Sequence, residues 1–240
     1  MPMKIRGPSH LAAVVLTGAT AAFAQSGASR ILLCGDSMLK AVARSIVREF
    51  SDTPSMTCDQ QISIGTGLAR PDVHNWPAKI REAATSKPAV AVIFLGANDN
   101  QNLQAAGGQV AVFGTPEWDR EYASRVAAVL RELREAGVRH ILWLGLPDMR
   151  EKKLHDDTRR INAILRAECD RVPEAEYFDV APLFSPQPGT YSAYVVRGGK
   201  VVQTRANDGI HLNVEGADIL ARAIRERLSA KPGLLTATAP

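Results

Sequence analysis

The sequence predicts one α/β domain, a three-layer α/β/α sandwich around a central parallel sheet of about five strands. Short apolar runs alternate with amphipathic stretches of helical period, which is typical of consecutive strand–helix units. One run, Ala89 to Leu95, is apolar at every position, as expected for a central strand buried on both faces. A length of 240 residues suits one such domain and is short for two.

The expected elements of the first half follow from these runs and from turn residues. They are a strand at Ile31–Leu33, a helix over 39–50, a strand near Met56–Ile64, a short helix at Pro77–Ser86 and the apolar strand already named. A polar, glycine-containing loop over 100–114 follows that strand.

The second half begins with a long helix, because Thr115 suits an N-cap, Pro116 a first turn and Gly137 a stop. The remaining elements are a strand at His140–Leu146, a helix at Thr158–Arg171, a short strand at Tyr177–Val180, a β-hairpin over 191–205 that turns at Arg197–Lys200, and a helix after Asn213. We expect the domain to cover 25–230 and the Ala/Thr/Pro-rich segment 231–240 to be a flexible tail.

The N-terminus is typical of an exported protein. Lys4 and Arg6 precede an apolar run over 11–22, and a small-x-small site ends at Ala24. This pattern predicts a secretory signal peptide over residues 1–24, cleaved after about Ala24, and a periplasmic or secreted protein. The run is too short and too rich in Ala and Thr for a stable membrane anchor.

Composition excludes several other classes. The formal charge is +4, and part of it lies in the predicted signal peptide; no basic stripe interleaved with aromatic residues indicates nucleic-acid binding. No Cys-x-x-Cys or His-Glu-x-x-His pattern occurs, so neither a metal site nor a cofactor is predicted. The cysteines are Cys34, Cys58 and Cys169. A bridge between the first two is conceivable, but small buried apolar side chains are the favoured interpretation.

The loop after the first strand carries Gly35-Asp36-Ser37-Met38 and opens a helix. Ligands of such sheets bind outside the carboxyl ends of the strands, where a serine would present its hydroxyl beside the positive end of a helix dipole. Ser37 is therefore a candidate nucleophile. The alternative is that Ser37 only caps the helix, which on this tripeptide alone is the commoner role.

Three further loops carry matching chemistry. Gly65 and Gly67 follow the second strand and allow a close approach of backbone to ligand. Asn98 follows the third strand and could donate to an oxyanion, although Asn-Asp is also a common turn. Asp208 precedes His211 by three residues, so a tight turn can place the carboxylate on the imidazole, which activates a serine. Each signal is weak alone, but all four converge on one crevice.

With these residues the chain resembles the SGNH, or GDSL-like, hydrolases, named for a Ser, a Gly, an Asn and a His in four blocks. The matching positions are Ser37, Gly67, Asn98 and His211, with Asp208 three before the last. The resemblance is closest to a bacterial exported branch described only as a domain of unknown function. It rests on Leu68-Ala69-Arg70-Pro71-Asp72, Trp76-Pro77-Ala78-Lys79-Ile80, Gly145-Leu146-Pro147-Asp148-Met149-Arg150 and Asp208-Gly209-Ile210-His211.

The resemblance implies the flavodoxin-like SGNH fold, Ser37 as nucleophile, and His211 with Asp208 as its activating pair. It also implies an oxyanion hole of the Ser37 and Gly67 N–H groups and the Asn98 amide, with Gly65 as the alternative glycine. We further expect Arg70, Arg150 and Asp36 as candidate substrate-binding residues, although the two arginines could equally pair with nearby aspartates. Trp76 and Trp143 are expected to be packing residues.

The function predicted in this way is an exported serine esterase that removes acyl groups, especially O-acetyl groups, from an envelope or extracellular glycan or a small acylated molecule. An O-acyltransferase with the same three residues and a non-catalytic glycan-binding module on the same fold are the alternatives. A dinucleotide-binding protein is disfavoured, because the Gly-x-Gly follows the second strand and Arg70 stands where a third glycine is needed.

Overall fold

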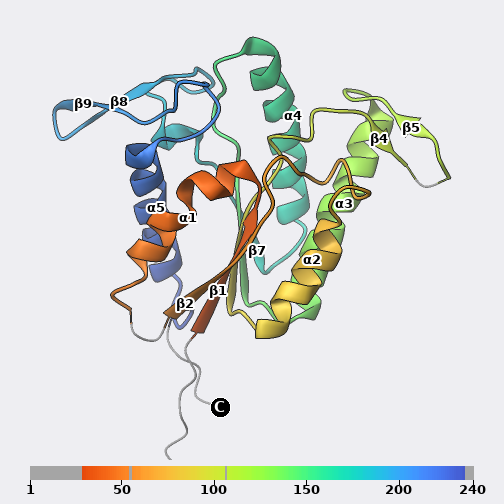
Figure 1. The fold of residues 1–240 in the computed structure, drawn as a ribbon, viewed down its shortest axis with the longest axis horizontal. Coiled ribbons are helices and arrows are strands. Elements are labelled where there is room, and N and C mark those ends of the chain that lie inside the picture. The colour runs from red at the N-terminus through yellow and green to blue at the C-terminus, as the bar shows by residue number, and fades with distance from the viewer. Residues whose placement is uncertain (1–28, 54–55, 106, 236–240) are drawn as a thin grey trace, which may run out of the picture.

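The computed structural model describes residues 29–53, 56–105 and 107–235, and they form the predicted sandwich (Figure 1). The central sheet has five parallel strands in the order β2-β1-β3-β6-β7. These strands are β1 (Ser29–Gly35), β2 (Met56–Ile62), β3 (Val90–Phe94), β6 (His140–Leu144) and β7 (Ala175–Phe178). The predicted fold class is confirmed, and the predicted signal peptide, residues 1–24, lies outside the described residues.

Helices cover both faces of this sheet. On one face α1 (Ser37–Glu49) packs against α5 (Val214–Ser229), and on the other α3 (Pro116–Glu135) packs against both α2 (Trp76–Ala83) and α4 (Lys152–Cys169) (Figure 1). Short 3₁₀ turns, η1 (Ala84–Ser86) and η2 (Ala181–Leu183), follow α2 and β7. Helices on both faces require central strands that are apolar on both sides, which the sequence supplies in β1, β3 and β6.

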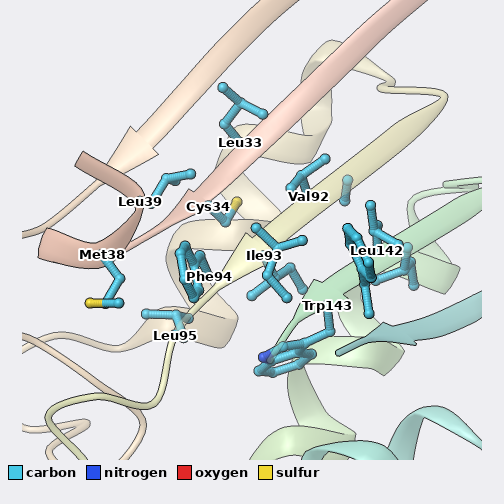
Figure 2. Packing of buried hydrophobic residues seen from close by; sticks show 14 of the residues in the cluster. Leu33, Cys34, Met38, Leu39, Val92, Ile93, Phe94, Leu95, Leu142 and Trp143 are labelled. Carbon is cyan, nitrogen blue, oxygen red and sulfur yellow. The ribbon is translucent and has the colours of Figure 1, made fainter. Parts of the chain in front are cut away.

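The core runs through the three middle strands. Every residue of β3 and β6 is buried, and β1 is exposed only at Arg30. Figure 2 shows side chains of β1, β3 and β6, Cys34 and Trp143 among them, packed close together in the core. Trp76 and Trp143 are both fully buried, as expected for packing residues. Cys34, Cys58 and Cys169 are free thiols, and Cys34 lies opposite Gln61 in the strand register rather than opposite Cys58.

Local capping explains where the helices begin. Thr115 accepts a hydrogen bond from the Trp118 N–H, and Asn213 accepts one from Gly216, so α3 and α5 begin where the sequence predicts. The helix expected at Thr158 begins earlier, at Lys152, because the Glu151 carboxylate accepts from the N–H groups of Lys153 and Leu154. Glutamate is an uncommon N-cap, so the sequence pattern predicts the start of this helix too late.

Two small hairpins stand outside the main sheet. One, β8 (Tyr194–Arg197) with β9 (Lys200–Gln203), was predicted. The other, β4 (Leu103–Gln104) with β5 (Val110–Ala111), lies within the loop expected to be irregular. At the C-terminus the segment 231–235 packs against the domain: Leu234 is buried, and the Arg139 guanidinium donates to the carbonyls of Gly233 and Leu234.

The strand order fixes where a crevice can form. From β1 the chain crosses to β2 on one side and later to β3 on the other, so the order reverses between β1 and β3. In open α/β sheets ligands bind at such a reversal, outside the carboxyl ends of the strands. Ser37 follows β1 and Asn98 follows β3, so both lie at this point.

Candidate active site

Ser37 occupies the first position of α1, and its neighbour Asp36 is the cap. The Asp36 Oδ1 accepts the Met38 N–H at 2.8 Å, which fills the capping role considered for Ser37. The Ser37 hydroxyl is therefore left for another partner. Asp36 is completely buried, whereas Ser37 is partly exposed, so the helix start presents its hydroxyl and conceals its carboxylate.

The hydroxyl meets the imidazole predicted for it. Ser37 Oγ lies 2.8 Å from His211 Nε2, and His211 Nδ1 lies 2.7 Å from Asp208 Oδ2. The structure thus brings together, over 174 residues of sequence, an uninterrupted chain from carboxylate to imidazole to hydroxyl. In this arrangement Nδ1–H donates to the carboxylate and Nε2 is free to accept the hydroxyl proton.

Asp208 is held by the turn that it starts. Its Oδ1 accepts the N–H groups of Ile210 at 2.7 Å and His211 at 3.0 Å. Partial burial raises the pKa of Asp208, but these bonds and the one from the His211 ring outweigh burial and hold the pKa at about 2. Asp208 is therefore ionised at neutral pH, although 44% of its side chain is exposed.

Arg205, whose role the sequence does not predict, holds this turn through its main-chain carbonyls. Its side chain is almost fully buried and donates to the carbonyls of Gly209 and Ile210 on one side and to the Asp148 carbonyl, at 2.6 Å, on the other. Its guanidinium also lies over the Tyr191 ring. The Asp208–His211 turn is thereby attached to the loop after β6. An arginine three residues before the Asp carries no sequence signal, because surface arginines are common.

Asn98 lies beside the nucleophile with both amide hydrogens engaged. Its Nδ2 donates to Asp36 Oδ2 and to the Thr66 carbonyl, each at 2.9 Å. The amide therefore joins the loops after β1, β2 and β3. It lies where an oxyanion donor is expected, but donation to a substrate requires one of these bonds to be exchanged or shared.

Gly67 is buried, and its lack of a side chain has a local cause. A Cβ there would lie 2.0 Å from Asp99 Oδ1, an oxygen that accepts the Ala69 N–H at 2.8 Å. Asp99 is completely buried and also accepts from the Tyr122 hydroxyl at 2.8 Å, so it cannot move aside cheaply. The N–H groups of Ser37 and Gly67 have no acceptor among the described residues. Gly65, the alternative glycine, is exposed with open space around it.

Burial sets the electrostatics behind the nucleophile. Desolvation raises the pKa of Asp36 to about 7; the Met38 N–H opposes this, and the nearby charge of Asp99 adds to it. Burial likewise raises the pKa of Asp99. Two buried carboxyl groups that resist ionisation thus lie close to each other near the nucleophile, and Asp36 gains its negative charge only as pH rises through about 7.

The two arginines expected near the substrate have protein partners. Arg70 forms an ion pair with Asp72, Nη2 to Oδ2 at 2.6 Å, and both side chains are at least half exposed. Arg150 donates from its main-chain N–H to the Gly209 carbonyl and from its guanidinium to the Asn207 carbonyl. Both partners of Arg150 belong to the loop that carries Asp208, so Arg150 borders the site.

Within residues 29–53, 56–105 and 107–235 no group of His, Cys, Asp or Glu side chains could hold a metal ion. No helix in the same described part is long and apolar enough to cross a membrane.

Comparisons with solved structures show the same fold in several enzymes. A family 3 carbohydrate esterase from Clostridium thermocellum superposes with a TM-score of 0.53 at 10% identity, over 83% of this chain and 94% of that one. A family two carbohydrate esterase from the same organism, solved with cellohexaose, gives 0.53 at 16% identity over 86% and 65%. A salicylyl-acyltransferase from a tetracycline biosynthetic pathway gives 0.52 at 14% identity over 89% and 58%. At these identities the likeness concerns the fold alone.

A sequence comparison with curated proteins finds no match. The family described as "Protein of unknown function (DUF459)" matches residues 30–227, nearly the whole of the described domain. The motifs that suggested the SGNH-like branch lie within this range, so the predicted resemblance is confirmed. The chain belongs to the DUF459 family, a family of SGNH-like hydrolases.

Proposed function

We propose that this protein is a serine esterase that hydrolyses carboxylic esters through an acyl-serine intermediate, with O-acetyl groups on an envelope or extracellular glycan as its substrates. The observation that carries the proposal is the hydrogen-bonded chain from Asp208 through His211 to Ser37, with distances of 2.7 and 2.8 Å. A binding module has no need of an ionised carboxylate aligned with an imidazole and a hydroxyl.

In the first half of the reaction the Ser37 Oγ attacks the ester carbonyl carbon while His211 Nε2 takes the hydroxyl proton. Asp208, ionised because its pKa is about 2, stabilises the imidazolium that forms. The C–O bond of the alcohol then breaks, His211 gives its proton to the leaving oxygen, and the acyl group remains on Ser37. Water attacks this ester in the second half, with His211 again as base, and the released acid restores the serine.

The oxyanion of both tetrahedral intermediates needs donors that are not already engaged. The N–H groups of Ser37 and Gly67 are suitable, since neither has an acceptor among the described residues. Asn98 is the third donor in this proposal. Its hydrogen would shift from the Thr66 carbonyl toward the oxyanion, and the bond to Asp36 would keep the amide in place.

The openness of the site supports a large substrate and hydrolysis rather than transfer. Ser37 is partly exposed, and the side chains of His211 and Asp208 are 30% and 44% exposed. A polymer-bound acetyl group can approach such a site, and water reaches His211 without a gate. The predicted export and the fold shared with carbohydrate esterases support a glycan as the alcohol.

The test is hydrolysis of p-nitrophenyl acetate and of longer acyl esters by the mature protein, beside Ser37→Ala. We expect acetate hydrolysis that the variant lacks, and a rate that falls with acyl length. Transfer of acetate to an added glycan in preference to water would favour the acyltransferase. Folded protein with no activity above Ser37→Ala, and no reaction with a phosphonate probe, would leave the binding module.

A further inference from the structure

A cavity lies on the far side of the loop that Arg205 joins to the Asp208–His211 turn. It has a volume of about 270 Å³ and lies between that loop, α4 and the segment around Gly189. Small-molecule pockets in proteins begin at roughly 300 Å³, so this one suits a single ring with its substituents. Leu146, Pro147 and Ala163 give it an apolar wall.

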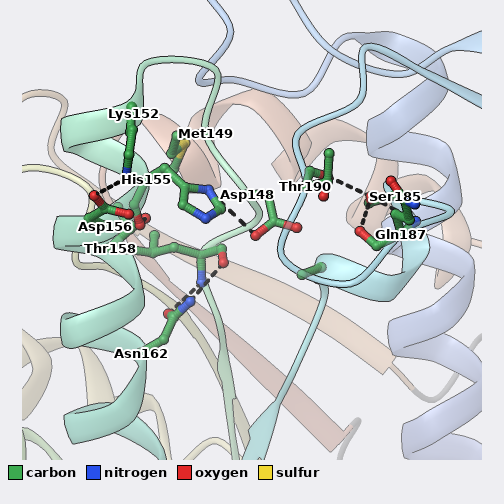
Figure 3. Close-up of polar contacts among 12 residues, drawn as sticks. Asp148, Met149, Lys152, His155, Asp156, Thr158, Asn162, Ser185, Gln187 and Thr190 are labelled. Carbon is green, nitrogen blue, oxygen red and sulfur yellow. Dashed lines mark hydrogen bonds and ion pairs between the residues drawn. The ribbon is translucent and has the colours of Figure 1, made fainter.

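Asp148 is a buried polar group of this cavity whose carboxylate faces His155 and Arg205 but keeps one oxygen without a hydrogen bond. Its side chain is only 9% exposed, yet Oδ2 has no hydrogen-bond partner among the described residues. Oδ1 faces His155 Nδ1 at 3.6 Å, longer than a hydrogen bond. Figure 3 shows the carboxylate between His155 on α4 and the segment that carries Ser185 and Thr190. A buried carboxylate oxygen without a donor is costly, and a ligand hydroxyl would satisfy it.

The cavity also presents a cation at its edge. Arg166 is engaged, since it pairs with Asp179 and lies over the Tyr177 ring. Arg159 makes no hydrogen bond or ion pair within the described part of the chain, and it reaches across from α4 so that a Cβ built on Gly189 would lie 3.2 Å from its Nη1. A guanidinium without a hydrogen-bonded partner in such a place matches a ligand carboxylate, with which it can form two parallel bonds.

We propose that this cavity is a subsite for a sugar acid, a uronic-acid-like ring whose hydroxyl donates to Asp148 and whose carboxylate accepts from Arg159. The apolar wall faces the carbon side of the ring. The choice of a sugar rests on the glycan-directed function proposed above. The requirement that the ligand carry a hydrogen-bond donor for Asp148 and an acceptor for Arg159 rests on the residues that line the cavity. The substrate class is thereby narrowed to acidic glycans.

The position of Asp148 connects this subsite to the reaction. Its main-chain carbonyl accepts from the Arg205 guanidinium, which also donates to Gly209 and Ile210, and the Arg150 N–H two residues on donates to Gly209. A ring bound at Asp148 is therefore one loop away from His211. In this proposal one residue of a glycan chain is held there while an acetylated residue of the same chain reaches Ser37.

The experiment titrates Ser37→Ala protein with glucuronate, glucose and glycine and follows amide chemical shifts by NMR, so that binding is read without turnover. We expect shifts around 146–163 and about tenfold tighter binding of glucuronate than of glucose. Arg159→Ala should abolish that preference, and Asp148→Asn should weaken both sugars. Arg44→Ala, which removes another exposed arginine, on α1, and the same charge, is the control and should change nothing.

Several results would overturn the subsite. These are no shift with any probe up to its solubility limit, binding of glycine without glucuronate, or an equal effect of Arg44→Ala. Arg159 is exposed, so its variant tests the proposal even if Asp148→Asn fails to fold. Glucuronate binding in a protein without esterase activity would keep the subsite and remove the proposed function. Activity on neutral acetyl esters without glucuronate binding would keep the proposed function and remove the subsite.

Discussion

The two halves of the candidate site are held by different means. The nucleophile half, Asp36, Ser37 and Asn98, lies on the ends of the central strands β1 and β3, and its carboxylate is completely buried. The acid–base half, Asp208 and His211, lies in a loop whose carboxylate is 44% exposed. One aspartate consequently has its pKa raised by burial to about 7, and the other has its pKa held by hydrogen bonds at about 2.

This difference shows that the side chains of the two halves are positioned, and their aspartates ionised, by different interactions. Burial positions the nucleophile half: Asp36 has no exposed surface, and its carboxylate accepts from the Met38 N–H and the Asn98 amide. The acid–base half depends on local bonds: Asp208 accepts from two N–H groups of its own turn, and Arg205 holds the carbonyls behind it. Activity should therefore be sensitive to substitutions that alter side-chain shape in the first half, which solvent conditions should affect little. In the second half activity should respond to solvent conditions and tolerate altered side-chain shape.

The largest effect is expected from the imidazole. His211→Ala removes the only base within reach of Ser37 in the described site and should lower kcat by about 10⁵-fold to 10⁶-fold. Asp208→Ala should lower kcat less, on the order of 10³-fold. Removal of a buried carboxylate from such a triad lowers kcat roughly 10⁴-fold, and solvent already screens this exposed one. Steady-state hydrolysis of p-nitrophenyl acetate measures both. Equal losses would show that exposure does not weaken the acid–base half.

The next effect concerns Asn98. Asn98→Ala removes the proposed third oxyanion donor and should lower kcat about 100-fold with little change in KM. It also leaves the Asp36 Oδ2 and the Thr66 carbonyl without their Asn98 donor, so the unfolding free energy should fall by about 1–3 kcal/mol.

The matched control for Asn98 is Gln101→Ala, which removes a nearby amide that donates only to the Asn98 carbonyl. It should retain nearly full kcat. A loss of stability in Asn98→Ala with unchanged kcat would make Asn98 a link between loops rather than an oxyanion donor.

A smaller effect on rate is expected from Arg205, which acts through the turn it holds. Arg205→Lys keeps the charge, but one ammonium cannot reach the carbonyls of both Asp148 and Ile210. We expect kcat and the rate of phosphonate labelling of Ser37 to fall by about tenfold while KM stays constant. Arg139→Lys, at the other end of the domain, also removes an arginine bound to two carbonyls and should leave both rates unchanged. Equal rates in the two variants would reduce Arg205 to a structural role.

The sequence predicted the buried half of the site more completely than the exposed half. Apolar runs located β1 and β3, and their loops placed Ser37 and Asn98 at the reversal of strand order. The spacing of Asp208 and His211 predicted their contact. Arg205 could not be found in this way, since its role depends on the carbonyl of Asp148, 57 residues away in the sequence. The start of α4 could not be predicted either, because glutamate is an uncommon N-cap and carries a weak sequence signal.

The pH dependence of stability separates the two halves most directly. Asp36 has a folded pKa of about 7 against 3.8 unfolded, so the stability associated with its proton is complete below pH 3.8 and is lost as pH rises through 7. Asp208 has a folded pKa of about 2, so its contribution is present above 3.8 and is lost as pH falls toward 2.

Urea unfolding of wild type, Asp36→Asn and Asp208→Asn across this range tests both signs. Between about pH 4 and pH 7 wild type should lose stability relative to Asp36→Asn, on the order of 4 kcal/mol, because over this range the unfolded chain releases the Asp36 proton and the folded protein keeps it. Any fixed cost of the new amide facing Asn98 cancels, since only the change with pH is compared. Asp208→Asn should differ from wild type in slope only in the acid range, and by less than about 2 kcal/mol because the group is exposed. Parallel curves for wild type and Asp36→Asn would mean that Asp36 is ionised in the fold, and that hydrogen bonds rather than burial control both halves.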